Sequence, residues 1–328
     1  MTDFYGLPTQ TIGNDHIRVE YLAEAGLRVV RLFMANSASS ENFLAETPGV
    51  AWDTPYGPYF LRGGHRLWHA PEGAPRSSLP EPRDLDIAAL QGGVRLSQPA
   101  EPETGICKEL EIRLDANRPA LTIIHKLSNE GLWPVELAPW AISQLALGGV
   151  AILPQPTGPI DPHGLRPNRC LVLWPYTSLT DPRVELNDDY WLVHGRPQLP
   201  PCKIGYLNRC GWVGYLRNGI LLIKRFRPAV GQPHPDSGCN VEVHCSDTCL
   251  ELETLAPLCT LAPGQSAAHV EQWEFFTRTD FPMTREGIRS MVSLLPAQCL
   301  APLPEEELGN VHGESAAKGC LFGISEKE

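Results

Sequence analysis

The sequence predicts an all-β fold of many short strands in one large domain. Prolines (32) and glycines (29) make up almost a fifth of the 328 residues, which is high for a helical protein and normal for strands joined by turns. Short apolar or alternating runs recur along the chain, with turn residues between them. All-β chains often fold as one unit of about 250 residues or more, and a chain of this length buries a sizeable core without disulfides or metal.

The composition indicates a globular, acidic protein. Hydrophobic residues make up 42% of the chain and charged residues 20%, and 27 Lys and Arg against 38 Asp and Glu give a net charge of −11. This excess of acid argues against nucleic acid or an anionic membrane as the main partner. The first residues contain no basic start and apolar run, so no secretory leader is expected, and the ten cysteines are then reduced thiols. We therefore expect a cytoplasmic protein.

Strands are predicted wherever an apolar or alternating run is bounded by turn residues. The first two, 16–23 and 26–34, form a hairpin, and the others are 93–98, 105–114, 120–127, 134–144, 149–154, 170–174, 211–217, 219–226, 240–245, 249–255 and 268–278. Asn218-Gly219, between two apolar runs, is the strongest short-range hairpin signal in a sequence. The uncharged stretch 137–153 contains Pro139 and Gly148-Gly149, so it predicts two buried strands rather than a membrane span.

One helix and one long loop complete the predicted domain, which spans residues 1–303. The helix covers 285–295, because Thr284 is a good N-cap and apolar residues fall on one face. The segment 154–201 is dense in proline, and long irregular segments inside a domain are usually functional loops or lids. Trp174 in this loop is a candidate binding residue. The polar, aperiodic residues 304–328 predict a disordered tail.

Residues 62–69, Arg-Gly-Gly-His-Arg-Leu-Trp-His, are the densest group of candidate ligand-binding side chains. Two glycines allow the backbone to approach a ligand closely. Arg62, His65 and Arg66 supply hydrogen-bond donors and Trp68 an apolar face, which suits a sugar, and His69 is a further candidate. The alternative is a tight Gly-Gly turn with an arginine and a tryptophan packed over it. We predict a binding loop.

Residues 240–253 form the second candidate group. Strand alternation puts Asn240, Glu242 and His244 on one face, and Glu251 and Glu253 on one face of the following run. A connecting loop of two or four residues would place Glu242 opposite Glu253 and His244 opposite Glu251, whereas a three-residue loop would scatter the group. Repulsion between neighbouring carboxylates raises the pKa of at least one of them. One carboxyl group can then act as an acid while the other, ionised, acts as a base. Alternating acidic residues are also typical of a solvated outer face, and the spacing alone favours that interpretation.

Outside these two groups, single residues are weaker candidates. His125 shares a face with Leu121 and Ile123, which indicates a buried or half-buried core histidine. Lys224 and Arg225 end a strand, where they either meet a carboxylate or phosphate of a ligand or protect a solvated sheet edge. The cysteines contain no Cys-x-x-Cys pair, so no zinc site is predicted. The common nucleotide-binding, α/β-hydrolase and zinc-protease motifs are also absent.

Three segments together resemble the bacterial DUF4380 proteins: 63–68 (Gly-Gly-His-Arg-Leu-Trp), 132–140 (Leu-Trp-Pro-Val-Glu-Leu-Ala-Pro-Trp) and 251–264, which ends in Leu-Ala-Pro-Gly. These proteins look like a branch of the galactose-mutarotase-like superfamily, and the likeness covers about residues 15–280. It implies a β-supersandwich that binds a sugar on the concave face of its larger sheet. It also implies aldose 1-epimerase chemistry, in which a glutamate takes the proton of the anomeric hydroxyl and a histidine donates one to the ring oxygen.

The resemblance carries over to this chain in part. The catalytic glutamate of those enzymes precedes a final Leu-x-Pro-Gly turn, which is 261–264 here, and both Glu242 and Glu253 qualify. The arginine of the early glycine-rich segment corresponds to Arg62 or Arg66.

The catalytic histidine of the superfamily has no direct counterpart. It would follow the strand at 124–129 by some ten residues, where this chain has Pro139-Trp140. Either the ring-opening reaction has been lost, or the acid is supplied by another histidine, of which the candidates are His65, His69, His125 and His244.

The sequence thus predicts a carbohydrate-active protein of mutarotase type, a sugar epimerase or a related cofactor-free acid/base enzyme. Its ligand is a mono- or oligosaccharide, with Trp68 and Trp140 as stacking surfaces. Two alternatives stay open: a non-catalytic carbohydrate-binding or sensing protein, and a lyase or hydrolase of acidic sugars, which Lys224 and Arg225 would suit. We expect no cofactor or metal and no nucleic-acid or membrane partner, and make no prediction of the oligomeric state.

Overall fold

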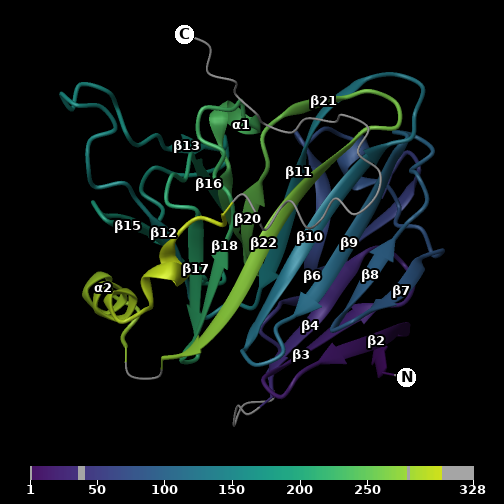
Figure 1. The fold of residues 1–328 in the computed structure, drawn as a ribbon, viewed down its shortest axis with the longest axis horizontal. Coiled ribbons are helices and arrows are strands. Elements are labelled where there is room, and N and C mark those ends of the chain that lie inside the picture. The colour runs from purple at the N-terminus through teal and green to yellow at the C-terminus, as the bar shows by residue number, and fades with distance from the viewer. Residues whose placement is uncertain (1, 36–40, 279–280, 305–328) are drawn as a thin grey trace.

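The structure is a computed structural model that describes residues 2–35, 41–278 and 281–304. In this part of the chain two antiparallel sheets, of twelve and ten strands, pack against each other (Figure 1). The predicted all-β fold is confirmed. Residues 305–328, nearly all of the predicted tail, lie outside the described residues.

The larger sheet has the order β1-β2-β3-β4-β6-β11-β20-β19-β16-β13, with β5 paired to β6 and β21 paired to β11. Its strands are β1 (Thr2–Phe4), β2 (Leu7–Gly13), β3 (Ile17–Leu22), β4 (Arg28–Met34), β5 (Glu46–Thr54), β6 (Gly57–Ala70), β11 (Val135–Leu145), β13 (Val172–Leu173), β16 (Cys202–Tyr206), β19 (Val241–Cys245), β20 (Leu250–Leu255) and β21 (Cys259–Leu261). Segments far apart in the sequence, β6, β11, β20 and β19, therefore lie side by side in the middle of this sheet.

The smaller sheet has the order β14-β15-β12-β17-β18-β22-β10-β9-β8-β7. Its strands are β7 (Asp86–Leu90), β8 (Gly93–Ser97), β9 (Ile106–Leu114), β10 (Ala120–Asn129), β12 (Val150–Pro154), β14 (Val184–Leu186), β15 (Tyr190–His194), β17 (Trp212–Arg217), β18 (Ile220–Arg225) and β22 (Ser266–Thr277). The predicted strands on either side of Gly148-Gly149 are confirmed as β11 and β12, and they belong to different sheets. The chain thus crosses between the sheets at this turn.

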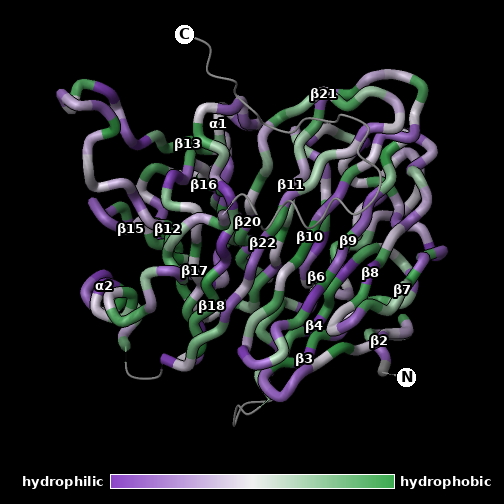
Figure 2. The backbone as a smooth tube through the Cα atoms, viewed as in Figure 1, coloured by the Kyte–Doolittle hydropathy of each residue, from purple (hydrophilic) through white to green (hydrophobic). Residues whose placement is uncertain are grey.

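Strand alternation builds the core between the sheets. In β19, Val241, Val243 and Cys245 are buried in the main apolar cluster, and in β20 Leu250 and Leu252 join it. Figure 2 shows the resulting alternation of apolar and polar residues along the strands. Burying each such Val or Leu side chain contributes about 1.5–3 kcal/mol. The intervening residues of these strands must point to the other side of the larger sheet.

The predicted helix forms as α2 (Arg285–Ser293), with Thr284 as its N-cap. Its apolar residues Ile288, Met291 and Val292 pack on an apolar cluster that includes residues of β12, β17 and β18. Figure 1 shows α2 beside these strands at one end of the sandwich. The remaining helical pieces are single turns, α1 (Pro235–Gly238), η1 (Arg76–Ser78) and η2 (Ala297–Leu300).

Several strands escape prediction because their sequences do not look like strands. Proline, glycine and exposed polar residues dominate β2 and β5, and β16 contains Lys203 and Gly205 among apolar residues. The predicted loop 154–201 is less irregular than expected, since it contains β13, β14 and β15. The hairpin across Asn218-Gly219 is confirmed, with positive φ at both turn residues.

The prediction of a loop at 62–69 is wrong, because these residues lie within β6, and the binding role of their side chains stays a prediction. Residues 57–63 of this strand pair with β5, whereas residues 64–70 pair with β11. Gly63 and Gly64, with φ of +93° and +80°, stand where the partner changes. A Cβ at Gly64 would lie 2.0 Å from the carbonyl oxygen of Val29, so the change of partner requires glycine here.

A network of polar side chains crosses the core between the sheets. Lys224 of β18 forms an ion pair with Glu271 of β22 (2.8 Å) and donates to Ser143 Oγ of β11 (3.0 Å). Ser143 Oγ lies 2.9 Å from His65 Nδ1, and His65 Nε2 lies 2.7 Å from His125 Nε2. All five side chains are 0% exposed. The ion pair and hydrogen bonds offset the cost of removing these groups from water.

The rest of the network fixes the proton positions. The carbonyl of His269 accepts from His125 Nδ1 (3.0 Å), so His125 Nε2 carries a lone pair and accepts from His65. Glu271 accepts further hydrogen bonds from Thr254 (2.6 Å) and Trp273 (2.8 Å). The histidines of this network are therefore neutral, and its single ion pair is Lys224–Glu271.

Replacing Gly64 by alanine tests the constraint in β6. We expect Gly64→Ala to lower the free energy of unfolding by about 3 kcal/mol or more, because the positive φ and the contact with Val29 both oppose a Cβ. Urea denaturation monitored by fluorescence measures this change. Gly49→Ala in β5 is the matched control, since nothing lies within 4 Å of its Cβ position. Equal stability of the two variants would contradict the explanation.

The buried histidines predict loss of stability in mild acid. Burial lowers the pKa of His125 to about 4 and that of His269 to about 3. Below pH of about 6.5 the unfolded chain binds protons that the folded protein excludes, so the free energy of unfolding falls as the pH drops from about 6.5 to about 4, by up to about 1.4 kcal/mol per pH unit for each histidine.

Urea denaturation across this pH range tests the prediction. His125→Gln is expected to make the slope shallower, whereas substitution of the exposed His163 by glutamine leaves it unchanged. Stability that stays constant from pH 7 to 4.5 would contradict the assignment of neutral histidines.

Candidate functional site

The side chains of the central strands that point away from the smaller sheet form what we call the polar face. Alternation along each strand assigns them to this side, because their neighbours lie in the core. They are Arg66 and Trp68 of β6, Trp140 and Gln144 of β11, Glu251 and Glu253 of β20, Glu242 and His244 of β19, and Lys203 of β16.

The register of β19 and β20 is the one that the four-residue loop predicts. Glu242 lies opposite Glu253, and His244 lies opposite Glu251. The interpretation as a solvated face is wrong, since Glu242 and Glu253 are both 0% exposed. The reason is that aromatic side chains on neighbouring strands and on the segment before β16 cover the carboxylates, which strand spacing alone does not reveal.

Lys203 is the centre of the polar face. Its Nζ lies 2.6 Å from Glu242 Oε2 and 3.1 Å from Glu253 Oε2. The indole Nε1 of Trp140 donates to the same Glu253 oxygen (2.8 Å). Lys203 Nζ also lies over the rings of Trp140 (4.8 Å) and Trp174 (4.7 Å). One ammonium is thus enclosed by two carboxylates and two indoles.

A second polar group adjoins the first along β20. Arg66 forms an ion pair with Glu251 (3.2 Å) and stacks on Trp68, with its guanidinium carbon 4.5 Å from the ring centroid. Gln144 donates to the same Glu251 oxygen (2.9 Å), and His244 Nδ1 lies 3.4 Å from the other. The ring of Trp68 contacts that of Trp140, with centroids 5.6 Å apart, so the two groups share an aromatic border.

The segment 154–201 contributes to the polar face, as its aromatic residues suggested. Trp174 covers Lys203, and Tyr176 packs edge-on against His244 with ring centroids 6.4 Å apart. Burial raises the pKa of Tyr176 to about 12.

Burial and charge set the protonation of the polar face. Burial raises the pKa of Glu242 well above its usual range, with Lys203 opposing and Glu253 adding to the shift. Burial also disfavours the Lys203 ammonium, but Glu253 and Glu242 outweigh it and raise the pKa of Lys203. For Glu251, Arg66 and His244 outweigh burial and lower the pKa. Lys203 is therefore positive and Glu251 is negative at neutral pH.

Several buried polar atoms of this face have no hydrogen-bond partner among the described residues. They include Nε and Nη1 of Arg66 and the Oε1 atoms of Gln144, Glu242 and Glu253. A buried polar group without a partner costs about 1–3 kcal/mol, so such groups in one place indicate a position for water or a polar ligand. Trp68 stacks on the Arg66 guanidinium, and Trp140 donates to Glu253, so each tryptophan adjoins one of these side chains.

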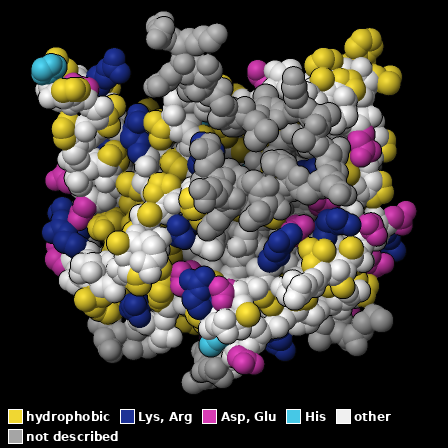
Figure 3. Space-filling view, viewed as in Figure 1, with side chains coloured by type: hydrophobic (Ala, Val, Ile, Leu, Met, Phe, Trp, Pro, Cys, Tyr) yellow, Lys and Arg dark blue, Asp and Glu magenta, His cyan; other side chains and the backbone are white. Residues whose placement is uncertain are grey.

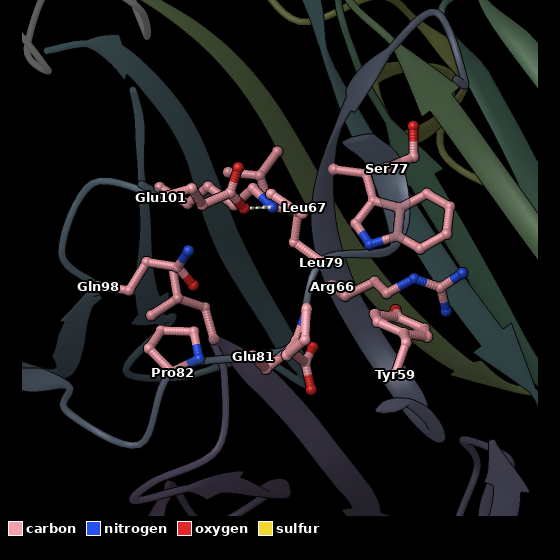
Figure 4. Close-up of a pocket in the computed structure, with 13 residues that line it drawn as sticks. Tyr59, Arg66, Leu67, Ser77, Leu79, Glu81, Pro82, Gln98 and Glu101 are labelled. Atoms are coloured by element: carbon pink, nitrogen blue, oxygen red, sulfur yellow. Dashed lines mark ion pairs between the residues drawn. The ribbon is translucent and has the colours of Figure 1, made fainter. Parts of the chain in front are cut away.

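A small cavity of about 20 Å³ adjoins Arg66 and Trp68 on the side of β9 and residues 77–82. Figure 4 shows Arg66 and Tyr59 at one side of this cavity, Gln98 and Glu101 at the other, and Glu81 between them. Lys108 forms an ion pair with Glu101, drawn as a dashed line.

Four predicted site residues lie apart from the polar face. Alternation turns His65 to the other side of the larger sheet, and the other three belong to strands β10 and β18 of the smaller sheet. His65, His125 and Lys224 are in the network between the sheets, on the opposite side from Arg66. Arg225 faces away from the core and donates to the carbonyls of Ala301 and Pro302 and to Gln272. Neither Lys224 nor Arg225 is placed to meet a ligand on the polar face.

The remaining predicted residues have structural partners elsewhere. Arg62 is paired with Glu81 (3.3 Å). His69 lies between the sheets with Nε2 3.6 Å from Glu101. Asn240 is fully buried, where its oxygen accepts from the backbone N–H of Asn208 and its amide donates to the Asn208 and Pro228 carbonyls.

His65, His125 and Glu271 are close enough to hold a metal, with one donor atom from each within 4.8 Å of the others. Each donor already has a protein partner, however: the two histidines bond to each other, and Glu271 bonds to Lys224, Thr254 and Trp273. The Lys224 ammonium at 2.8 Å also repels a cation. These residues fit a hydrogen-bond network better than a metal site.

Sequence reasoning misses Lys203 and Gln144. Lys203 lies in the short strand β16, which the pattern does not predict, and a single lysine between apolar residues gives no functional signal. Gln144 lies within an uncharged run, at the end of the predicted strand 134–144, and only its neighbours in space make it part of the site. A lysine in an otherwise buried strand is the one signal that could have marked β16.

On the face shown in Figure 3, Lys and Arg side chains are interspersed with Asp and Glu. No described helix has the length and apolar character needed to cross a lipid bilayer. The nine cysteines of the described residues are free thiols.

No protein-family model and no curated protein matches the sequence. Solved structures match over most of the chain. A protein of Escherichia coli K12, provisionally named an aldose 1-epimerase, is 12% identical with a TM-score of 0.53, and the match covers 83% of this chain and all of that one. A galactose mutarotase-like protein of Lactobacillus casei is 11% identical with a TM-score of 0.52, covering 82% of this chain and 100% of that one.

A TPR-domain containing protein of Parabacteroides distasonis matches 92% of this chain with half of its own length, at 16% identity and a TM-score of 0.56. Identities at this level establish the fold alone, so the resemblance to DUF4380 proteins stays a prediction. The two packed antiparallel sheets and these likenesses show that the chain has the galactose-mutarotase-like β-sandwich fold.

Proposed function

We propose that the protein binds a sugar on the polar face and exchanges its anomers by acid/base catalysis without a cofactor. The observation that carries this proposal is the set of unpaired polar atoms on Arg66, Gln144, Glu242 and Glu253, on a face that also bears two tryptophans. Two of the similar structures are named as an aldose 1-epimerase and a galactose mutarotase-like protein, and their names support the same reading.

The chemistry of the polar face suits a sugar. Hydroxyl groups both donate and accept, and the face offers donors from Arg66 and acceptors from Gln144 and the glutamates. The C–H side of a sugar ring packs on aromatic surfaces, which Trp68 and Trp140 provide. The two cations of the face already contact carboxylates, so a neutral sugar fits it better than an acidic one.

Glu253 is the candidate base. Its Oε2 is held by Trp140 and Lys203, while its Oε1 is buried and has no hydrogen-bond partner among the described residues. Removing the proton of the anomeric hydroxyl allows its oxygen to form a C=O bond with the anomeric carbon, and the bond from that carbon to the ring oxygen breaks. The ring oxygen keeps the electron pair and takes a proton from an acid. Reclosure on the other face of the aldehyde gives the other anomer.

A non-catalytic sugar-binding protein is the rival proposal. It is favoured by Pro139-Trp140, which stands where the resemblance calls for the catalytic histidine, and by the two hydrogen bonds that already engage Glu253. The two proposals share the binding site and differ only in the fate of the bound sugar.

Ligand binding tests the shared part of both proposals. A neutral monosaccharide at 100 times its dissociation constant is expected to add about 2.7 kcal/mol to the free energy of unfolding, which a thermal-shift screen of neutral sugars and uronic acids detects. Failure of every sugar to shift the melting temperature would contradict both.

Anomer exchange divides the two proposals. We expect the protein to accelerate exchange of a bound sugar, measured by magnetisation-transfer NMR, and Glu253→Gln to lower the catalysed rate by about 10²- to 10⁴-fold while binding persists. Glu136→Gln is the control, since Glu136 is exposed on the strand that carries Trp140. Sugar binding with exchange no faster than in buffer would favour the non-catalytic protein.

A further inference from the structure

The two central carboxylates of the polar face share a single ammonium. Glu242 and Glu253 stand opposite each other on adjacent strands, and each places an oxygen within 3.1 Å of Lys203 Nζ. Both carboxyl groups are 0% exposed and Lys203 is 5% exposed. Two ionised carboxylates would leave one uncompensated negative charge in this enclosed space, which is costly without water. Retention of one proton by the pair removes that charge.

The surrounding charged and titratable groups do not supply a second cation. Arg66 is paired with Glu251, which also has His244 within 3.4 Å. The other groups that act on the pair are the acidic side chains of Glu72 and Asp236, the phenol of Tyr176 and the thiol of Cys239. All four are neutral or negative, so none of them favours a second ionised carboxylate.

The hydrogen bonds decide which glutamate keeps the proton. Glu253 Oε2 accepts from Trp140 Nε1 and from Lys203 Nζ, and both bonds stabilise the ionised form. Glu242 has the contact with Lys203 and no hydrogen bond from another described residue. The asymmetry assigns the proton to Glu242, and burial of Glu242 raises its pKa in the same direction.

We propose, resting on the proposed function, that Glu242 is the catalytic acid, which donates its proton to the ring oxygen while Glu253 removes the proton of the anomeric hydroxyl. The carboxyl pair then takes the place of the glutamate–histidine pair that the resemblance implies. Each glutamate has an Oε1 without a protein partner for this purpose. The hydroxyl oxygen and the ring oxygen are bonded to the same carbon, so two neighbouring carboxyl groups can reach both.

The carboxyl pair holds the same number of protons before and after the reaction. In ring opening, Glu253 gains the hydroxyl proton and Glu242 loses its own, so the pair keeps one proton and its charge is unchanged. In reclosure, Glu253 returns its proton to the aldehyde oxygen, which becomes the anomeric hydroxyl. The hydroxyl formed from the ring oxygen gives its proton to Glu242 as it attacks the aldehyde carbon. Lys203 contacts whichever carboxylate is ionised and is a positioning residue. No other co-reactant is required.

The first experiment detects the proton without any substrate. Isotope-edited infrared spectroscopy of glutamate-labelled protein at pH 7 is expected to show the C=O band of a buried protonated carboxyl group. Glu242→Gln removes the band, because the remaining Glu253 has Lys203 to itself and stays ionised. Glu136→Gln leaves it unchanged. A spectrum of the unaltered protein without a protonated carboxyl band at pH 7 would overturn the proposal, whatever the behaviour of the variants.

The second experiment measures anomer exchange of a bound neutral sugar. We expect Glu242→Gln and Glu253→Gln each to lower the catalysed rate by 10²-fold or more, with the dissociation constant changed less than tenfold and the melting temperature confirming that both variants fold. Full activity of Glu242→Gln beside an inactive Glu253→Gln would overturn the role of Glu242 and leave the proposed function intact. Sugar binding without exchange in the unaltered protein would instead overturn the proposed function and with it the catalytic role, while the infrared band still reports the shared proton.

Discussion

Strand alternation in the middle of the larger sheet is the constraint on which the rest of this structure depends. Adjacent residues of one strand point to opposite sides of the sheet. In β6, His65 faces the core and Arg66 faces away, and in β20 Thr254 faces the core and Glu253 faces away. The sheet therefore carries two polar groups back to back. A shift of one residue in any of these strands would exchange them.

The two polar groups solve the problem of buried charge differently. Between the sheets, Lys224 and Glu271 balance one for one, and neutral histidines extend the network without adding charge. On the polar face, Lys203 meets two glutamates and several polar atoms stay unpaired. A complete network holds the sheets together, whereas an incomplete one leaves room for a ligand. This difference, rather than the number of charged residues, separates the structural group from the candidate site.

Local sequence signals predicted a good part of the fold. Alternation in 240–253 predicted which residues share a face, with the pairing of Glu242 and Glu253 as one of two possible registers. The Asn-Gly pair predicted its hairpin, and Thr284 predicted the start of α2. The failures have one physical origin. The glycines of 62–69 are typical of a loop but lie in a strand that changes partners. The lysine of β16 is unusual in a buried strand, and it is tolerated because glutamates of other strands neutralise its charge.

The sequence by itself determined the all-β class, most strand positions and the residues that share a face, because alternation and turn preferences act over a few neighbouring residues. Only the tertiary structure decided which face is buried in the core, that two glutamates share Lys203, and that His65 and His125 meet between the sheets. These outcomes depend on contacts between strands that are separated by tens to hundreds of residues. Outside the hairpins, no local pattern of the chain encodes the partner that each strand finds.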